Sequence, residues 1–368
     1  MSVTVFTMTH KKFDEPKDGI YVPLHVGRAK AKDLGYAGDD TGDQISAMNC
    51  YYGELTGVYW IWKNFKTDGA VGVCHYRRYL VDDQDVILTE KEYETLLQRY
   101  DIITTKVLRL NCAYYDGYAA NHHIKDLIET GNVIREKYPD YYNVYERIVH
   151  SNKTLFGNIM VTSKQLFDEY AAWLFDIFFE VQKRIDIDSY DDYHKRVFGF
   201  ISEILLLVWI TQRKLSFYEC KVGMLGEKKE TIEMKHQLAA YFKRKDIAGA
   251  KAYFLSSLEK RPDVLMEASD IYGELKLSMQ VISTCDLEQQ AYGSSVLDRT
   301  TDFRELMRYF SRLNAIAAKM RDGEDTLEDR AYLKNENVSK IALQIAMQIA
   351  GALSNAPYGT GLGKPYKM

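Results

Sequence analysis

The sequence predicts an α/β domain with a mostly parallel central sheet, followed by an all-helical domain. Up to about residue 226, short apolar runs alternate with helical patterns, which is typical of a parallel sheet covered on both faces. Beyond that point no β-branched run appears and helical periodicity takes over. A chain of 368 residues is also too long for one ordinary core. We therefore expect two domains, residues 1–226 and 227–368.

The expected strands of the first domain are short and separated by helices. Residues 2–8 alternate and are β-branched, which predicts the first strand. Residues 10–44 contain two prolines and five glycines and are expected to form a long loop, and loops of this length are usually either functional or disordered. Further strands are expected at 69–80, 100–105, 155–162 and 215–222, and helices at 45–64, 90–99, 118–137, 140–150, 163–185 and 196–212.

The second domain shows only helical patterns. Helices are expected at 229–244, 246–259, 262–281, 301–321 and 337–354, followed by an irregular tail from Ser354. Residues 243–263 look like half of a tetratricopeptide repeat, but no second copy follows at the expected period. The packing positions of that half-repeat would be Ala248, Ala250, Phe254, Leu258 and Pro262.

Composition narrows the classes of protein. The chain has 48 basic and 52 acidic side chains, so a nucleic-acid partner, which needs many cations to neutralise phosphates, is disfavoured. The five cysteines are odd in number and form no CxxC pair, which argues against a zinc knuckle or a disulfide framework. The first 13 residues do not resemble a signal peptide, and the longest apolar stretch, Phe198–Ile210, is too short to span a membrane. We expect a cytoplasmic protein.

A cationic segment follows the strand expected at 69–80. His75, Tyr76, Arg77 and Arg78 come where this strand should end, and ligands of open α/β sheets gather at such carboxyl ends. Two adjacent guanidinium groups cannot share one face of a strand, so we expect one to face a ligand while the other braces the loop. Arginine suits a diphosphate because its planar fork gives two parallel charge-assisted hydrogen bonds. A surface pair of salt-bridged arginines is the alternative.

Several polar residues interrupt apolar segments. Gly157 and Asn158 break an apolar strand, which indicates a bulge or a close backbone approach to a ligand. Burial of Glu203 among Phe, Ile and Leu would raise the carboxyl pKa and make it a usable base near neutral pH, whereas a salt bridge to a nearby arginine is the alternative. Asn49 and Glu54 need partners if they are buried, and a sugar hydroxyl is one candidate. Glu54 could equally be a solvated helix residue.

Two groups of residues have side chains of the kinds that bind metals. Asp82, Asp83 and Asp85 could hold Mg²⁺ or Mn²⁺ through carboxylates, but acidic clusters in loops are more often solvated. His122 and His123 have no further ligand at metal-binding spacing, so we expect no zinc site there.

Together, these segments resemble a bacterial family of capsular and exopolysaccharide synthesis proteins long catalogued as a domain of unknown function. The resemblance covers roughly the first 220 residues, and the combination of ELTxxYWIWKN with HYRRY is highly specific. It is carried by YVPLHVGRA (21–29), GDQISAMNCYYGELTGVYWIWKN (42–64), VGVCHYRRYL (71–80), FGNIMV (156–161) with FDEYAAWLF (167–175), and RVFGFISEILL (196–206).

The resemblance implies a glycosyltransferase of GT-A-like fold that uses a nucleotide sugar. Most GT-A enzymes carry an Asp-x-Asp metal motif at the strand end where this chain has His75–Arg78, so a Mn²⁺ or Mg²⁺ cofactor is left open. The implied roles divide the site in two. Thr9, His10, Val26, Gly27, Arg28, His75, Tyr76 and Asn158 would bind the nucleotide sugar, and Arg77, Arg78 and Glu203 would be catalytic, with Glu203 as the base of an inverting displacement.

The resemblance also implies the substrates and the setting. The donor would be UDP-linked, with galactose or galactofuranose as the sugar, and the acceptor a glycan or an undecaprenyl-diphosphate-linked glycan. The helical domain would provide a peripheral contact with the inner face of the plasma membrane or a homodimer interface. The alternative class is a non-catalytic scaffold of a polysaccharide-synthesis complex. A different nucleotide-using enzyme, such as a sugar-phosphate transferase, is disfavoured, because the chain has neither a GxxxxGK[ST] motif nor a GxGxxG motif after a strand.

Overall fold

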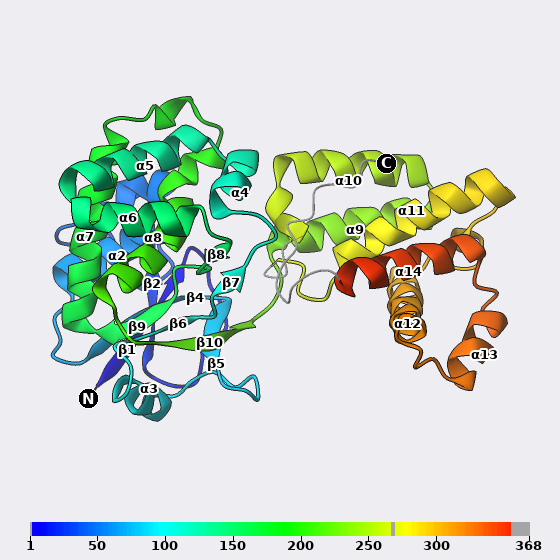
Figure 1. Cartoon of the computed structure of the whole chain (residues 1–368), viewed down its shortest axis with the longest axis horizontal. Coiled ribbons are helices and arrows are strands. Elements are labelled where there is room, and N and C mark those ends of the chain that lie inside the picture. The colour runs from blue at the N-terminus through cyan, green and yellow to red at the C-terminus, as the bar shows by residue number, and fades with distance from the viewer. Residues whose placement is uncertain (1, 266–268, 355–368) are drawn as a thin grey trace. The chain divides into compact units, whose positions relative to one another are not determined.

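A computed structural model of the chain describes residues 2–265 and 269–354. The chain divides into two compact units, Met1–Leu225 and Gly226–Met368, and both units are drawn in Figure 1. The first unit is a mixed α/β structure, and the described part of the second unit contains helices without strands.

The first unit is built on an eight-stranded sheet of order β3-β2-β1-β4-β5-β10-β6-β9. Pairing is parallel for β1–β2, β1–β4, β2–β3 and β6–β10, and antiparallel for β4–β5, β5–β10, β4–β9 and β6–β9. The expectation of a mostly parallel sheet is therefore wrong, and the sheet is mixed. The strands are β1 (Val3–Thr9), β2 (Tyr21–His25), β3 (Ala37–Gly38), β4 (Ala70–His75), β5 (Arg78–Val81), β6 (Ile102–Thr105), β9 (Met160–Ser163) and β10 (Phe217–Met224), and β7 (Leu108–Arg109) pairs with β8 (Lys153–Thr154) in a second sheet.

Two of the expected elements are divided. The strand expected at 69–80 is the hairpin β4–β5, in which His75 pairs with Arg78 across a turn at Tyr76 and Arg77. The long loop expected at 10–44 contains β2 and β3. In the sequence, Pro23 disfavours a strand because it has no N–H to donate to a neighbouring strand. In the structure β3 pairs with β2 only at Leu24 and His25, so Pro23 is not paired with β3.

Helices cover both faces of this sheet, most of them on one side (Figure 1). Phe6, Met8 and Val73 belong to a large core that includes α2, α5, α6, α7 and α8, whereas Val3 and Val5 point into a smaller core with α3. The helices are α1 (Asn49–Tyr52), α2 (Leu55–Asn64), α3 (Glu90–Leu97), α4 (Tyr114–Asn121), α5 (Ile124–Lys137), α6 (Pro139–Val149), α7 (Lys164–Gln182) and α8 (Val197–Arg213). Ser163 caps α7 as expected, since its hydroxyl accepts from the Leu166 N–H.

Two predicted helices are interrupted at positions that matter for the site. The helix expected at 45–64 is broken at Gly53, whose φ of +55° is unfavourable for other residues, and Glu54 follows in the turn. The helix expected at 118–137 is broken at His122 and His123, where the His122 ring stacks on Phe200 of α8 at 4.3 Å. Both breaks bring polar side chains to the start of α8.

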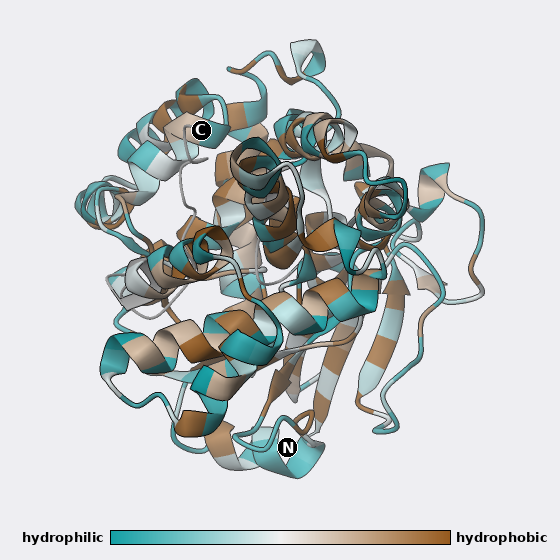
Figure 2. Cartoon of the chain, turned by 90° about the vertical axis from the view of Figure 1, so that its right-hand side faces the viewer, coloured by the Kyte–Doolittle hydropathy of each residue, from teal (hydrophilic) through white to brown (hydrophobic). Residues whose placement is uncertain are grey.

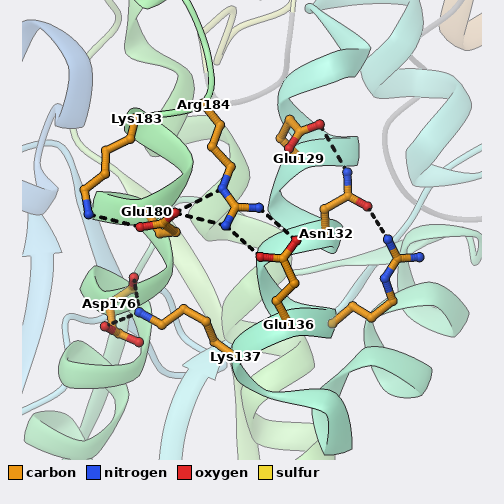
Figure 3. Close-up of polar contacts among 9 residues, drawn as sticks. Glu129, Asn132, Glu136, Lys137, Asp176, Glu180, Lys183 and Arg184 are labelled. Atoms are coloured by element: carbon orange, nitrogen blue, oxygen red, sulfur yellow. Dashed lines mark hydrogen bonds and ion pairs between the residues drawn. The ribbon is translucent and has the colours of Figure 1, made fainter.

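An ion-pair network joins α5 to α7 on the surface (Figure 3). Arg184 donates to Glu136 of α5 and to Glu180 of α7, and Lys137 pairs with Asp176. These side chains are partly exposed, so the network fixes the packing of the two helices more than it adds free energy of unfolding.

The second unit is a group of amphipathic helices with its own core. Figure 2 shows both hydrophilic and hydrophobic residues along the helices of the chain. The helices are α9 (Lys229–Lys243), α10 (Ile247–Lys260), α11 (Glu274–Tyr292), α12 (Phe303–Asp322), α13 (Leu327–Asn335) and α14 (Lys340–Ser354). The helix expected at 262–281 is displaced to α11, and α13 was not expected. Among helices of the described residues, none is long and apolar enough to cross a membrane.

The half-repeat of the sequence corresponds to α10 and the residues directly after it. Ala250 and Phe254 are buried as expected and Leu258 is half-buried, but Ala248 is exposed and is not a packing position. The side chain of Pro262 and the tail from residue 355 lie outside the described residues.

Candidate functional site

Three parallel strands end at one edge of the sheet. Thr9 ends β1 and pairs with His25 at the end of β2, while Met8 pairs with His75 at the end of β4. Loops that follow these strands therefore meet at this edge, which is the usual place for a ligand in an open α/β sheet.

The turn after β4 carries the cationic segment. His75 and Arg78 form the closing pair of the hairpin, and Tyr76 and Arg77 lie at its tip. The guanidinium of Arg78 lies over the Phe156 ring at 4.8 Å, and that of Arg77 lies over the Tyr76 ring at 5.3 Å. The two arginines thus face different surroundings.

Arg77 has an unsatisfied guanidinium. Its Nε and one terminal nitrogen are buried and have no hydrogen-bond partner among the described residues. Leaving charged donors buried and unpaired is costly, and an anion would remove that cost.

Aromatic and cationic side chains from the loop after β1 lie close to Tyr76, which belongs to the turn after β4. The Phe13 ring lies 6.0 Å from the Tyr76 ring and 5.9 Å from the Tyr36 ring. Lys11 Nζ lies 5.2 Å from the Tyr76 ring centroid, and Lys12 Nζ 4.3 Å from that of Tyr36. This group combines ring faces with positive charge, a combination suited to a nucleotide.

The residues expected to bind a nucleotide in the loops after β1 and β2 differ in their contacts. The Thr9 hydroxyl is engaged with the backbone of Lys11, so it stabilises the turn. His10 is exposed, with its ring edge-on to Tyr76 at 5.4 Å. Val26 is buried, and the Arg28 guanidinium is ion-paired with Asp40 at 3.3 Å. Arg28 therefore stabilises the loop after β2.

Asp39 holds the loop after β2 in place. Its buried carboxylate accepts from the N–H groups of Gly27, at 2.9 Å, and Arg28, at 3.2 Å, and from Ser46. Gly27 has a φ of +71°, and a Cβ there would lie 2.7 Å from the Asn49 side chain, so only glycine fits. Asp39 was missed in the sequence because its partners lie up to 12 residues away.

A second group of polar residues gathers around the turn at Gly157 and Asn158. The Gly157 N–H donates to Glu203 Oε1 at 2.9 Å, and its carbonyl accepts from His75 Nε2 at 2.6 Å. The Asn158 amide donates to Glu54 Oε1 at 2.8 Å. The structure thus brings together His75, Asn158 and Glu203, which were expected, and Glu54, for which the sequence left a solvated position equally open.

The two carboxylates of this group differ in pKa. Desolvation raises the pKa of Glu203 to about 7, against the opposing effects of the Gly157 N–H and the Arg78 charge. Desolvation acts on Glu54 as well, but there the positive charges of His75, when protonated, and Arg196, together with the Asn158 amide, hold the pKa below its ordinary value. Desolvation lowers the pKa of His75. One carboxylate is therefore poised to exchange a proton near neutral pH, and the other stays ionised.

Replacing Glu203 with glutamine is expected to stabilise the first unit as pH rises. Glu203 ionises at about 7 in the folded state but near 4.5 when unfolded, so its ionisation favours the unfolded state between these pH values. Glutamine does not titrate and can still accept from Gly157. The variant should gain, relative to the parent, up to about 3 kcal/mol of unfolding free energy between pH 4.5 and 7. Urea titrations across this range measure the gain, and the exposed Asp68→Asn serves as a control. A pH-independent difference would contradict the raised pKa.

Two residues near Glu203 were not singled out from the sequence. The Tyr114 hydroxyl donates to the Phe200 carbonyl at 3.2 Å, and Arg196 precedes α8 with its charge close enough to favour the ionised forms of both carboxylates. Tyr114 comes from a segment that had no clear helical pattern, so no local signal pointed to it.

The acidic cluster after β5 is used in a turn. Asp82 Oδ1 accepts from the N–H groups of Gln84 and Val86, both at 2.8 Å, and Asp85 pairs with Lys221. Within the part of the chain that the structure describes, no group of three or more His, Cys, Asp or Glu residues is arranged to hold a metal ion.

The fold and this site define an α/β protein whose polar groups meet at the carboxyl ends of parallel strands. Residues 4–214 match the family described as a domain of unknown function (DUF4422), and the chain belongs to that family. No curated protein matches the chain. The chain is similar to the apo structure of WbbM, a bifunctional glycosyltransferase, with 29% sequence identity and a TM-score of 0.57. The match covers 62% of this chain and 46% of the WbbM chain, so this chain spans less than half of that structure.

Proposed function

We propose that the first unit is a glycosyltransferase that moves a sugar from a nucleotide-sugar donor to a hydroxyl of a glycan. The observation that carries the proposal is the cationic turn, in which two buried guanidinium nitrogens of Arg77 have no hydrogen-bond partner among the described residues. The charge of the neighbouring Arg78 acts on the half-buried Glu203. Similarity to a glycosyltransferase at 29% identity supports this proposal. A cation for a departing diphosphate and a carboxylate base are the two groups that such a transfer needs.

Each part of the site has a role in this proposal. The rings and cations around Tyr76 hold the nucleotide, with the loop of Val26–Arg28 beside them. Arg77 neutralises the diphosphate, whose negative charge grows as its bond to the sugar breaks. Glu203 takes the proton of the acceptor hydroxyl. The hydroxyl oxygen bonds to the anomeric carbon while the bond from that carbon to the diphosphate breaks, in an inverting displacement.

The finer assignments complete the proposal. The donor is UDP-linked, with galactose or galactofuranose as the sugar, and the acceptor is a glycan or an undecaprenyl-diphosphate-linked glycan of capsular or exopolysaccharide synthesis. Catalysis takes place in the cytoplasm, and the helical unit contacts the membrane surface or a second copy of the chain. The His75–Arg78 turn supplies positive charge where a metal ion would otherwise act, and the activity assay includes a test for a Mn²⁺ or Mg²⁺ requirement.

The test is turnover with a panel of UDP-, GDP- and dTDP-sugars, with glycan acceptors, in the presence of Mn²⁺, Mg²⁺ or a chelator. Release of the nucleoside diphosphate and formation of a glycosylated acceptor are both measured. Acceptor-dependent release from at least one donor is the expected result. Neither transfer nor hydrolysis with any donor, under any of the three conditions, would favour a non-catalytic scaffold instead.

A further inference from the structure

The turn at Gly157 and Asn158 is held in an uncommon backbone conformation. Both residues have positive φ, +87° for Gly157 and +51° for Asn158. Such conformations cost free energy in residues other than glycine and concentrate at functional sites. Here the turn is fixed from both sides, because Glu203 accepts from the Gly157 N–H and His75 donates to the Gly157 carbonyl.

The orientation of the Asn158 amide follows from its partners. One end of the amide lies 2.8 Å from Glu54 Oε1 and 3.3 Å from the Gly199 carbonyl oxygen. The carbonyl of Gly199 can only accept a hydrogen bond, and Glu54 is an acceptor when ionised, as its lowered pKa indicates. The end that faces them must therefore be the NH₂ group, and Oδ1 must point the other way.

The Oδ1 atom of Asn158 has no donor within the described part of the chain. Asn158 is only 8% exposed, and among the described residues no N–H or O–H reaches its Oδ1 atom. A buried carbonyl without a partner costs about 1–3 kcal/mol, and a group that donates a hydrogen bond to it would remove this cost. Glu203, which lies on the other side of the Gly157 peptide, is likewise an acceptor when ionised. A hydroxyl satisfies this requirement, whereas an ether or phosphate oxygen cannot.

We propose that Asn158 Oδ1 accepts a hydrogen bond from a hydroxyl group of the sugar substrate, and that Glu54 is the positioning residue that fixes the amide for this contact. This inference rests on the proposed function and adds a specificity to it. A sugar that lacks the hydroxyl leaves the buried carbonyl unpaired, so the site discriminates against the deoxy analogue. The hydroxyl belongs either to the donor sugar or to the acceptor.

The test combines substrate analogues with variants. The donor with the highest turnover in the nucleotide-sugar panel is compared with its monodeoxy analogues, and its acceptor with the corresponding deoxy acceptors, so that the two sources are separated. For the parent protein we expect kcat/KM to fall about 100-fold or more for one analogue. In Asn158→Gly, which keeps a residue suited to positive φ, the ratio of kcat/KM for the full substrate to kcat/KM for that analogue should be no more than about three.

Glu54 is tested by the same ratio. Glu54→Gln keeps an oxygen that can accept from the Asn158 amide and should retain most of the discrimination, whereas Glu54→Ala should lose it. A residue needed only for folding would lower both rates and leave their ratio unchanged. Glu54→Ala also serves as the second variant if Asn158→Gly does not fold.

The outcomes separate this inference from the proposed function. Turnover with equal use of every deoxy analogue, or with a ratio that is unchanged in Asn158→Gly, would overturn the inference alone and leave a buried water as the partner of Oδ1. No turnover by the parent protein with any donor would remove the proposed function, and this inference with it.

Discussion

Replacing Glu203 with glutamine is expected to lower kcat by about 100- to 10,000-fold, the usual contribution of a general base. Glutamine has the same shape and can still accept from the Gly157 N–H, so the turn should be preserved. The loss would therefore report the missing proton acceptor. Initial rates at saturating donor and acceptor measure it, and an unchanged melting temperature at pH 4, below both pKa values of Glu203, checks the fold.

The pH dependence of the parent protein tests the same role. A base must be ionised to act, so kcat/KM should rise about tenfold per pH unit below a pKa of about 7 and level off above it. Removing the nearby positive charge in Arg78→Ala should raise the pKa of Glu203 and shift this rise to higher pH. Activity in Glu203→Gln within a few-fold of the parent would contradict the assignment of Glu203 as the base.

Replacing Arg77 with alanine is expected to lower kcat/KM by about 100- to 1,000-fold, the loss typical of removing one group that stabilises developing negative charge. The guanidinium has buried nitrogens without partners among the described residues, so its removal should not disturb folding. Arg77→Lys should recover only part of the activity, because an ammonium cannot give two parallel hydrogen bonds to a diphosphate.

The matched control for Arg77 is Arg99→Ala, which removes an exposed arginine from the turn after α3. Its kinetics should equal those of the parent. If Arg77→Ala keeps full turnover, Arg77 has no role at the diphosphate and the cationic turn does not form the site.

Local patterns in the sequence predict many elements of the first unit. The alternation of residues 2–8 and the N-cap at Ser163 correspond to β1 and α7, because both signals depend on neighbours in the chain. β2 was missed because Pro23 opposes a strand, and the break at Gly53 was missed because an apolar helical pattern continues through it. The sheet is mixed because the hairpin at Tyr76 and Arg77 reverses the chain and because β9 runs antiparallel to both β4 and β6, and spacing alone indicates neither.

The candidate site depends on contacts that are distant in sequence. The sequence singled out Asn158 and Glu203 as polar residues among apolar neighbours, and the structure places both at one turn. It could not show that Glu54, 104 residues from Asn158, fixes the amide. The difference between Arg77 and Arg78 also required the structure, since it depends on what surrounds each guanidinium.

The central claim is that the turn after β4 binds the diphosphate of a nucleotide sugar through Arg77. Calorimetric titration of the parent and Arg77→Ala with the nucleoside diphosphate, and separately with the nucleoside alone, tests this most directly. We expect Arg77→Ala to weaken diphosphate binding at least tenfold, about 1.4 kcal/mol, and to leave nucleoside binding unchanged. Equal affinity of both proteins for the diphosphate would contradict it.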